Sequence, residues 1–393
     1  MIDQTVKTGQ YIVALIRSIL KNEAPPEKPG DVSFEDVFRM SKEHMISVMT
    51  YSAVEKLLVK PGEELLNKWS QSAYTNIAQS VVQLAERDSI YKTLEQYKIP
   101  YIPLKGCLVK EMYPKPEYRE MSDLDILVKR ADAAKLKPVM EALGYQCESF
   151  DIEKDDSYSK KPFMHVEMHY ELLSQDEVKF FQETGGYCTG IMDPWSNAIK
   201  VNEYRYEMRK EDMYLHLITH LYKHFKGAGT GIRQVTDLLV VKNHYSLDWE
   251  YINRELNGLG LSGFREDILN VLKVWYENAN PTEETDATAE YIFHAGSYGH
   301  HSTLVEHRIQ KMKAQDPTGS KPFLKYLLYR VFPPYEEMCR WYPLTRKSKL
   351  LLPIMWIYRL LYKCRTQFGR AIIELRTLKK IAIDEKNEKN SRS

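Results

Sequence analysis

The chain has 393 residues, enough for two or three domains. Its hydrophobic fraction of 43% and charged fraction of 28% are typical of a globular protein and exclude disorder as its main state. No run of 18 uncharged apolar residues occurs, so no transmembrane helix is expected, and the N-terminus does not resemble a signal peptide. None of the five cysteines forms a CxxC motif, so a reducing cytoplasmic location is expected.

Charge is unevenly distributed along the chain. The net charge is +1, but residues 321–382 contain 14 Lys or Arg and three Glu. That segment therefore carries +11, and because residues 383–393 are neutral, about −10 is left for residues 1–320. An acidic main body argues against general nucleic-acid binding.

The first hundred residues have helical patterns. Ser33, followed by Glu35 and Asp36, predicts a helix start. Residues 63–97 lack Gly and Pro and place apolar residues three and four apart, which predicts one long helix or two collinear ones.

A mixed pattern follows. Strands are expected at 99–104, 124–128, 145–150 and 164–172, and helices at 107–113 and 131–143, the latter ended by Gly144. Helices are expected again at 211–225 and 232–244, then helical patterns to about 315, a linker at 316–322, a basic helical tail at 323–382 and a frayed polar end. The expected fold is α+β: a small mixed-sheet core at 98–208, helical regions at 1–97 and 209–315, and the tail region at 316–393.

Acidic residues lie on two of the expected strands. Asp123 and Asp125 are two residues apart, so they share one face of their strand, while Leu124 and Ile126 face the core. His165, Glu167 and His169 likewise share one face of a later strand. Carboxylates brought together in this way suit Mg²⁺ or Mn²⁺, and two such ions can support phosphoryl transfer. The alternatives are a surface Asp pair and an edge strand with a polar face.

A short turn precedes these acids. Lys105 and Gly106 follow one strand and precede a helix. Glycine permits close approach of the backbone, and a helix N-terminus favours anions, so this turn is a candidate phosphate cradle.

Together the motifs L-K-G at 104–106, R-x-M-S-D-L-D-I-L-V at 119–128 and V-E-M-H at 166–169 resemble the nucleotidyltransferase superfamily with a polymerase-β-like core. They resemble most its uncharacterised bacterial branch with an LKG turn and an R-x-M-x-D-x-D block, over about residues 60–320. The resemblance implies that Asp123, Asp125 and Glu167 bind the metals and that Glu167 helps to deprotonate an acceptor hydroxyl. It also implies that Lys105 and Arg119 neutralise phosphate charge and that Ser122 bonds a phosphate or caps the strand.

The helical region adds a histidine cluster. His216, His220 and His224 are spaced by four residues and share one helix face, so a zinc site is one alternative and ordinary packing another. The resemblance extends to an H-x-x-K-H and an R-x-x-x-D pattern. It implies that Lys223 and Arg233 contact the nucleotide or substrate, that Asp237 orients Arg233, and that the cleft is lined by His169, His220, Lys223, His224, Arg233 and Asp237. The alternative is an Arg233–Asp237 pair that only holds two helices together.

The basic tail contains the apolar run LLLPIMWIY at 350–358, surrounded by Lys and Arg. It could pack on the body, contact an anionic membrane through residues 345–370, or bind a partner.

The expected function is Mg²⁺-dependent transfer of a nucleoside monophosphate from a nucleoside triphosphate, with ATP favoured, to a hydroxyl of a small molecule, sugar or peptide, with release of pyrophosphate. Alternatives are an inactive relative that binds a nucleotide or partner, and an enzyme that modifies protein or RNA.

Overall fold

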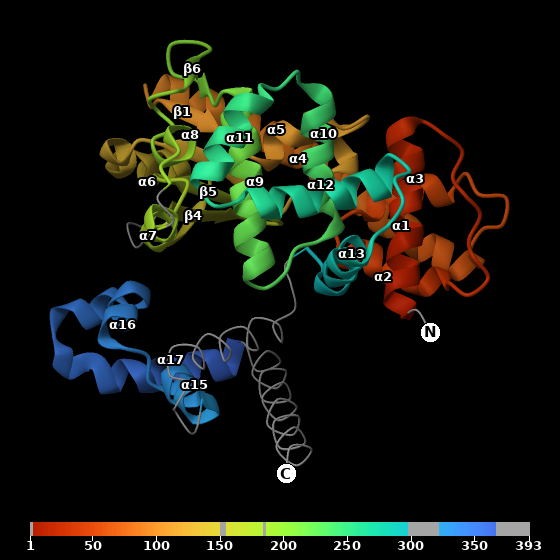
Figure 1. Ribbon diagram of the computed structural model, residues 1–393. Coiled ribbons are helices and arrows are strands. Elements are labelled where there is room, and N and C mark those ends of the chain that lie inside the picture. Colours follow the sequence, from red (N-terminus) through yellow and green to blue (C-terminus); the bar gives the residue numbers. More distant parts are fainter. Residues whose placement is uncertain (1–2, 150–154, 184–185, 298–321, 367–393) are drawn as a thin grey trace. The chain divides into compact units, whose positions relative to one another are not determined.

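The computed structural model describes residues 3–149, 155–183, 186–297 and 322–366 (Figure 1). The chain divides into two compact units, one made of residues 1–223 and 230–297 and the other of residues 224–229 and 298–393. The boundaries expected at 97/98 and 208/209 both fall inside the first unit. The division of that unit into three domains therefore remains a prediction.

Helices make up the N-terminal part of the first unit. Helix α1 (Gln4–Lys21) begins at Asp3, whose side chain accepts a hydrogen bond from the Thr5 amide. Helix α2 (Phe34–Glu43) begins at Ser33, as expected, because the Ser33 side chain accepts from the amide of Asp36. After α3 (Ser47–Val54), helix α4 (Glu63–Gln96) runs without a break for 34 residues.

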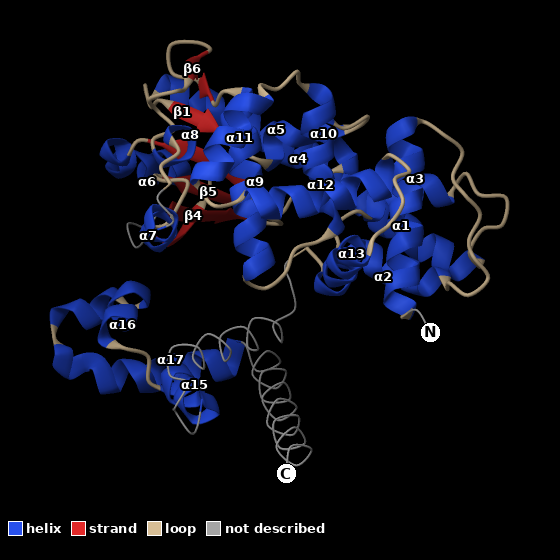
Figure 2. Ribbon diagram, viewed as in Figure 1, coloured by secondary structure: helices blue, strands red, loops and turns tan. Residues whose placement is uncertain are grey.

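The five strands form one mixed sheet in the order β1-β2-β5-β4-β3, which confirms the α+β class (Figure 2). Strand β2 pairs in parallel with β5 and antiparallel with β1, while β4 pairs antiparallel with both β5 and β3. The strands are β1 (Tyr101–Pro103), β2 (Leu124–Val128), β3 (Gln146–Ser149), β4 (Asp155–Lys160) and β5 (Met164–His169).

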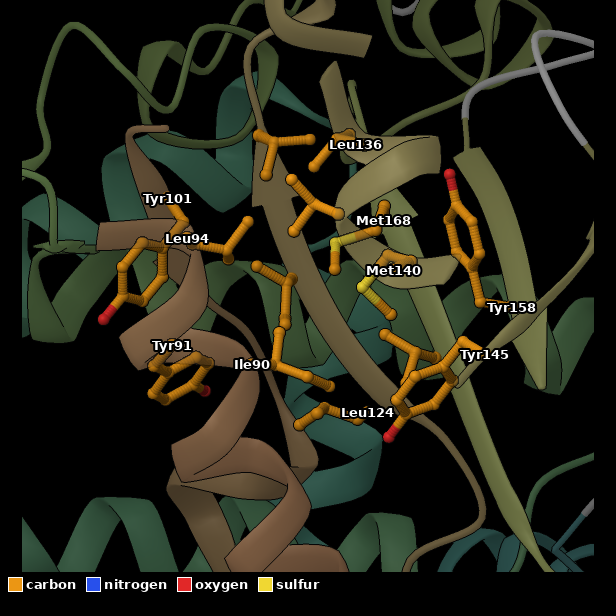
Figure 3. Packing of buried hydrophobic residues seen from close by; sticks show 14 of the residues in the cluster. Ile90, Tyr91, Leu94, Tyr101, Leu124, Leu136, Met140, Tyr145, Tyr158 and Met168 are labelled. Atoms are coloured by element: carbon orange, nitrogen blue, oxygen red, sulfur yellow. The ribbon is translucent and has the colours of Figure 1, made fainter. Parts of the chain in front are cut away.

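One face of this sheet packs against helices. Ile90 and Leu94 of α4 and Met140 of α6 (Ala133–Ala142) contact Leu124 and Met168 in a buried apolar cluster (Figure 3). Leu124, Ile126, Val166 and Met168 all belong to it. Because side chains alternate along a strand, the residues between them lie on the opposite face.

One strand of the five-stranded sheet was not expected from the sequence. Strand β4 was not expected because its sequence, DDSYSK, is almost entirely polar, yet its Asp156 and Tyr158 are fully buried. Helix 131–143 begins two residues later than expected, and Gly144 ends it with a φ of +82°. The sheet edge is extended by a short hairpin, β6 (Ile199–Lys200) and β7 (Tyr206–Glu207), through a bridge between Tyr101 and Arg205.

The remaining helices follow the sheet. In the first unit they are α5 (Gly106–Val109), α7 (Gln175–Glu183), α8 (Thr189–Met192), α9 (Lys210–Lys226, continuing into the second unit), α10 (Ile232–His244), α11 (Trp249–Gly258), α12 (Ser262–Tyr276) and α13 (Glu283–Ala295). The second unit contains α15 (Pro322–Val331), α16 (Tyr335–Trp341) and α17 (Leu352–Thr366).

Several expectations fall on residues that the structure does not describe. These are the helical continuation at 298–315, the linker at 316–321, and the tail beyond residue 366. Within the described ranges, no helix combines the length and apolar character needed to cross a bilayer.

Candidate active site

The parallel strands β2 and β5 bring two carboxylates side by side. Asp125 is the register partner of Glu167, one residue beyond the pair of Leu124 with Val166. Leu124 and Val166 point into the core, so Asp125 and Glu167 share the other face. The alternation in the two sequence motifs predicts these faces, and the register adds which residues lie opposite each other.

Asp123 lies directly before β2 on the same face. The Ser122 hydroxyl donates to Asp123 Oδ2 over 2.8 Å, and Nδ1 of His165 lies 3.6 Å from Asp123 Oδ1. Burial raises the pKa of Asp123, and the charges of Asp125 and Glu167 raise it further. The three carboxylates thus act on one another electrostatically, as the sequence analysis expected of a cation site.

Lys105 and His169 lie against these carboxylates. His169 Nε2 lies 2.8 Å from Asp125 Oδ1 and 3.4 Å from Glu167 Oε2, and Lys105 Nζ lies 3.4 Å from Asp125 Oδ1. Burial alone would raise the pKa of Asp125, but Lys105 and His169 outweigh it and hold that pKa well below its usual range. Burial would lower the pKa of His169, but its hydrogen bonds to the two carboxylates raise it.

Two residues near the site were not placed beside the carboxylates from the sequence. Asp155 of β4 places its Oδ2 3.6 Å from Nδ1 of His169. His216 of α9 is buried and close enough to help lower the pKa of Asp125. The polar sequence of β4 hid Asp155, whereas His216 was visible as the first histidine of the spaced triplet.

The LKG turn lies against Arg119. Lys105 has a positive φ of 44°, and α5 begins at Gly106. A Cβ on Gly106 would lie 2.7 Å from Nη1 of Arg119 and 3.1 Å from Sδ of Met121. Glycine is therefore required at 106 so that the arginine can pack against the backbone of the turn.

Arg119 itself forms a buried ion pair with helix α10. Its Nε and Nη2 donate to Oδ1 and Oδ2 of Asp237 over 2.9 and 2.8 Å, and the Tyr113 hydroxyl donates to Oδ1 over 2.9 Å. Arg119 is 6% and Asp237 2% exposed. The resemblance implies that Asp237 orients Arg233, its neighbour on the same helix. In the structure a guanidinium from another segment, that of Arg119, binds both of its carboxylate oxygens at once.

Arg233 forms a second contact between the same two segments, with the arginine on α10 and the acceptor in the loop. It lies in the first turn of α10 and donates through Nη1 to the carbonyl oxygen of Glu120. Helix α10 and the loop that carries Arg119 and Glu120 are thus joined by two arginines, one from each side.

The other residues expected in the cleft lie on α9. His220 is half-buried, and its ring centroid is 6.2 Å from that of His216. Lys223 is exposed, with Nζ 3.3 Å from Glu177 Oε1 of α7. His224 occupies the next position of the same helix and is half-buried.

Among the described residues, two groups of side chains have ligand atoms close enough to hold a metal ion, and neither includes His216 or His220. One is Asp125, Glu167 and His169, whose ligand atoms lie within 4.8 Å of one another. The other, Asp3, Glu290 and His294, is exposed and contains a 2.7 Å ion pair between Asp3 and His294. The first group is the one at the sheet, and its carboxylates beside Asp123 fit a hard divalent cation.

A small mixed sheet carries one aspartate on β2, a second directly before it, and a glutamate in register on the neighbouring strand, an arrangement that agrees with the class of nucleotide-transferring enzymes that the motifs resemble. Residues 30–277, more than half of the chain, match the family described as uncharacterised nucleotidyltransferases. The chain belongs to this family.

Other comparisons add little to this assignment. A solved structure that matches is the solution structure of the antibiotic-resistance factor ANT(2'')-Ia, at 9% sequence identity and a TM-score of 0.33, over 51% of this chain and 100% of that chain. So weak a similarity carries no argument. No curated protein matches the chain.

Proposed function

We propose that the protein transfers a nucleoside monophosphate from a nucleoside triphosphate to an acceptor hydroxyl and releases pyrophosphate. The observation that carries the proposal is the register of Asp125 with Glu167 on adjacent parallel strands, with Asp123 on the same face. Family membership supports the reaction class. ATP is the expected donor, and the acceptor is expected to be a small molecule, sugar or peptide.

Asp123, Asp125 and Glu167 would hold Mg²⁺ or Mn²⁺. Such ions stabilise the negative charge on the phosphates and lower the pKa of a nearby hydroxyl. These side chains fit a divalent cation because they supply three carboxylates whose negative charges repel one another. Oxygens of two of the carboxylates also lie within 4.8 Å of a histidine nitrogen.

Residues of the chain would bind the phosphates and accept the proton of the acceptor hydroxyl. The acceptor oxygen bonds to the α-phosphorus, the bond to the bridging oxygen breaks, and the hydroxyl proton passes to Glu167. The pKa of Glu167 is lowered, first by its hydrogen bond to His169, which favours the ionised carboxylate that a proton acceptor requires. Lys105, now beside Asp125, would turn to the phosphates.

The buried arginines would act by positioning. Arg119 packs against Gly106 and binds Asp237, and Arg233 holds the Glu120 carbonyl. We assign both to keeping the LKG turn and the Asp123 loop in place. Ser122 would hold Asp123 through its hydrogen bond, while His220, Lys223 and His224 of α9 remain candidates for contact with the nucleotide or the acceptor.

Calorimetric titration with ATP, GTP, CTP and UTP in the presence of Mg²⁺ tests the proposal. The wild-type chain is expected to bind at least one of them, and the double variant Asp123→Asn/Asp125→Asn to bind none. Asp88→Asn is the matched control, because the Asp88 side chain is 66% exposed on α4, and it should bind as the wild type does. Nucleotide binding that persists in the double variant would refute the assignment of these acids.

A further inference from the structure

Helix α17 exposes its apolar side. Ile354, Ile357 and Leu361 are 61, 60 and 67% exposed, and Tyr358 and Tyr362 are both 53% exposed. These residues are three or four positions apart, so they form one continuous stripe along the helix. A helix of a globular unit normally turns such a stripe inward.

The opposite side of α17 fixes this orientation. Arg359 is 1% exposed and donates through Nη1 to the carbonyl of Arg330 over 2.8 Å. Trp356 donates through Nε1 to the carbonyl of Pro333 over 2.9 Å, and Met355 is buried. The second unit therefore holds α17 through Met355, Trp356 and Arg359 and leaves the apolar stripe exposed.

The sequence around the stripe is strongly basic. Residues 338–373 contain eight Lys or Arg and neither Asp nor Glu. Lys347 and Lys349, just before α17, are exposed, as is Leu350 beside them. Apolar and cationic side chains thus lie together on the approach to the helix.

We propose that α17 binds the surface of an anionic lipid bilayer, with its stripe in the headgroup region. An interfacial helix needs an apolar face and positive charges that attract acidic lipids, and tyrosines are favoured at that depth. With 15 residues, α17 is too short to span a bilayer. A second copy of the chain would bring equally basic segments together, so charge favours the lipid surface over self-association.

Sedimentation with vesicles tests this directly on the full-length chain. Vesicles of phosphatidylcholine containing 30% phosphatidylserine are compared with vesicles of phosphatidylcholine alone. The test variant is Ile357→Asp/Leu361→Asp. The control, Leu58→Asp/Val59→Asp, adds the same charge at two side chains that are 91 and 67% exposed in the first unit.

The wild type is expected to bind the acidic vesicles at least about tenfold more tightly than the neutral ones, and more weakly at high salt. The stripe variant should lose about tenfold or more of this affinity, since two apolar side chains no longer enter the lipid. The control should stay within about twofold of the wild type.

Other results would overturn the proposal. One is the absence of wild-type binding to acidic vesicles, and another is a stripe variant that binds them as well as the control does. If the stripe variant instead lowers the melting temperature, or shifts the molar mass measured by light scattering, without weakening vesicle binding, the stripe is covered by the chain itself or by a second copy.

Discussion

Neutralising Asp237 should destabilise the first unit severely. In the variant Asp237→Asn the side chain keeps its size, but Arg119 loses the carboxylate that binds its Nε and Nη2. Arg119 is 6% exposed, so water cannot replace the lost partner. Arg119 is then left as a buried charge without compensation.

The expected cost follows from that burial. Removing one partner of a buried ion pair costs about 3–5 kcal/mol, a large part of the roughly 5–15 kcal/mol by which a domain is stable. The exposed pair of Glu64 with Lys68 has a shorter distance, 2.6 Å, but side chains 85 and 61% exposed. Glu64→Gln should therefore destabilise the chain far less than Asp237→Asn does.

Urea unfolding followed by circular dichroism measures both costs. The double variant Arg119→Met/Asp237→Leu supplies the decisive comparison, because it removes both charges and leaves apolar groups of similar size. It should be more stable than Asp237→Asn alone. The reasoning would be refuted if Asp237→Asn cost no more than Glu64→Gln. It would also be refuted if the double variant were less stable than Asp237→Asn, with the costs of the two substitutions simply adding.

Three further perturbations test the site and its support. Lys105→Ala should raise KM for the triphosphate by about tenfold or more, the loss of one charged contact, and leave kcat nearly unchanged; an unaltered KM in steady-state kinetics removes Lys105 from the phosphate site. Gly106→Ala should cost about 1–3 kcal/mol in urea unfolding because its Cβ would meet Arg119, whereas Gly30→Ala, with no atom within 4 Å, should not. Burial lowers the pKa of Lys110 to about 8, so the amine of Lys110 binds its proton more tightly in the unfolded chain than in the folded one. The stability of the wild type relative to Lys110→Met should therefore rise by about 2–3 kcal/mol between pH 7 and 10, and a pH-independent difference would contradict this.

The acidic strands could be predicted because their patterns are local. In β2 and β5 the apolar residues alternate with the acids, so the face of each side chain follows from the strand period alone. The expected bounds of β2 and α10, 124–128 and 232–244, agree with the structure. Ser33 was likewise readable as a helix cap, because capping depends on residues three positions apart.

Contacts between distant segments could not be read in the same way. The resemblance implies that Asp237 orients Arg233, whereas the guanidinium that binds Asp237 in the structure belongs to Arg119, 118 residues away. Strand β4 escaped notice because the burial of Asp156 depends on the hydroxyls of Tyr158, in the same strand, and of Tyr170, from another segment, and the contact with Tyr170 cannot be read from the sequence of β4. Burial of a polar group is decided by its partners, and the partners are set by the tertiary fold.

Arg119 and Arg233, which join α10 to the loop before β2, are contacts of this kind close to the candidate site. Arg119, in the loop before β2, binds Asp237 on α10. Arg233, on α10, donates to the carbonyl oxygen of Glu120, three residues before Asp123. Neither contact can lengthen without shifting the loop that ends at the first carboxylate. Since phosphoryl transfer depends on placing reacting groups to within about an ångström, this buried junction couples the helical region to the geometry of the carboxylates. Under the proposed function, α10 would therefore contribute to the position of Asp123 alongside the strand that follows it.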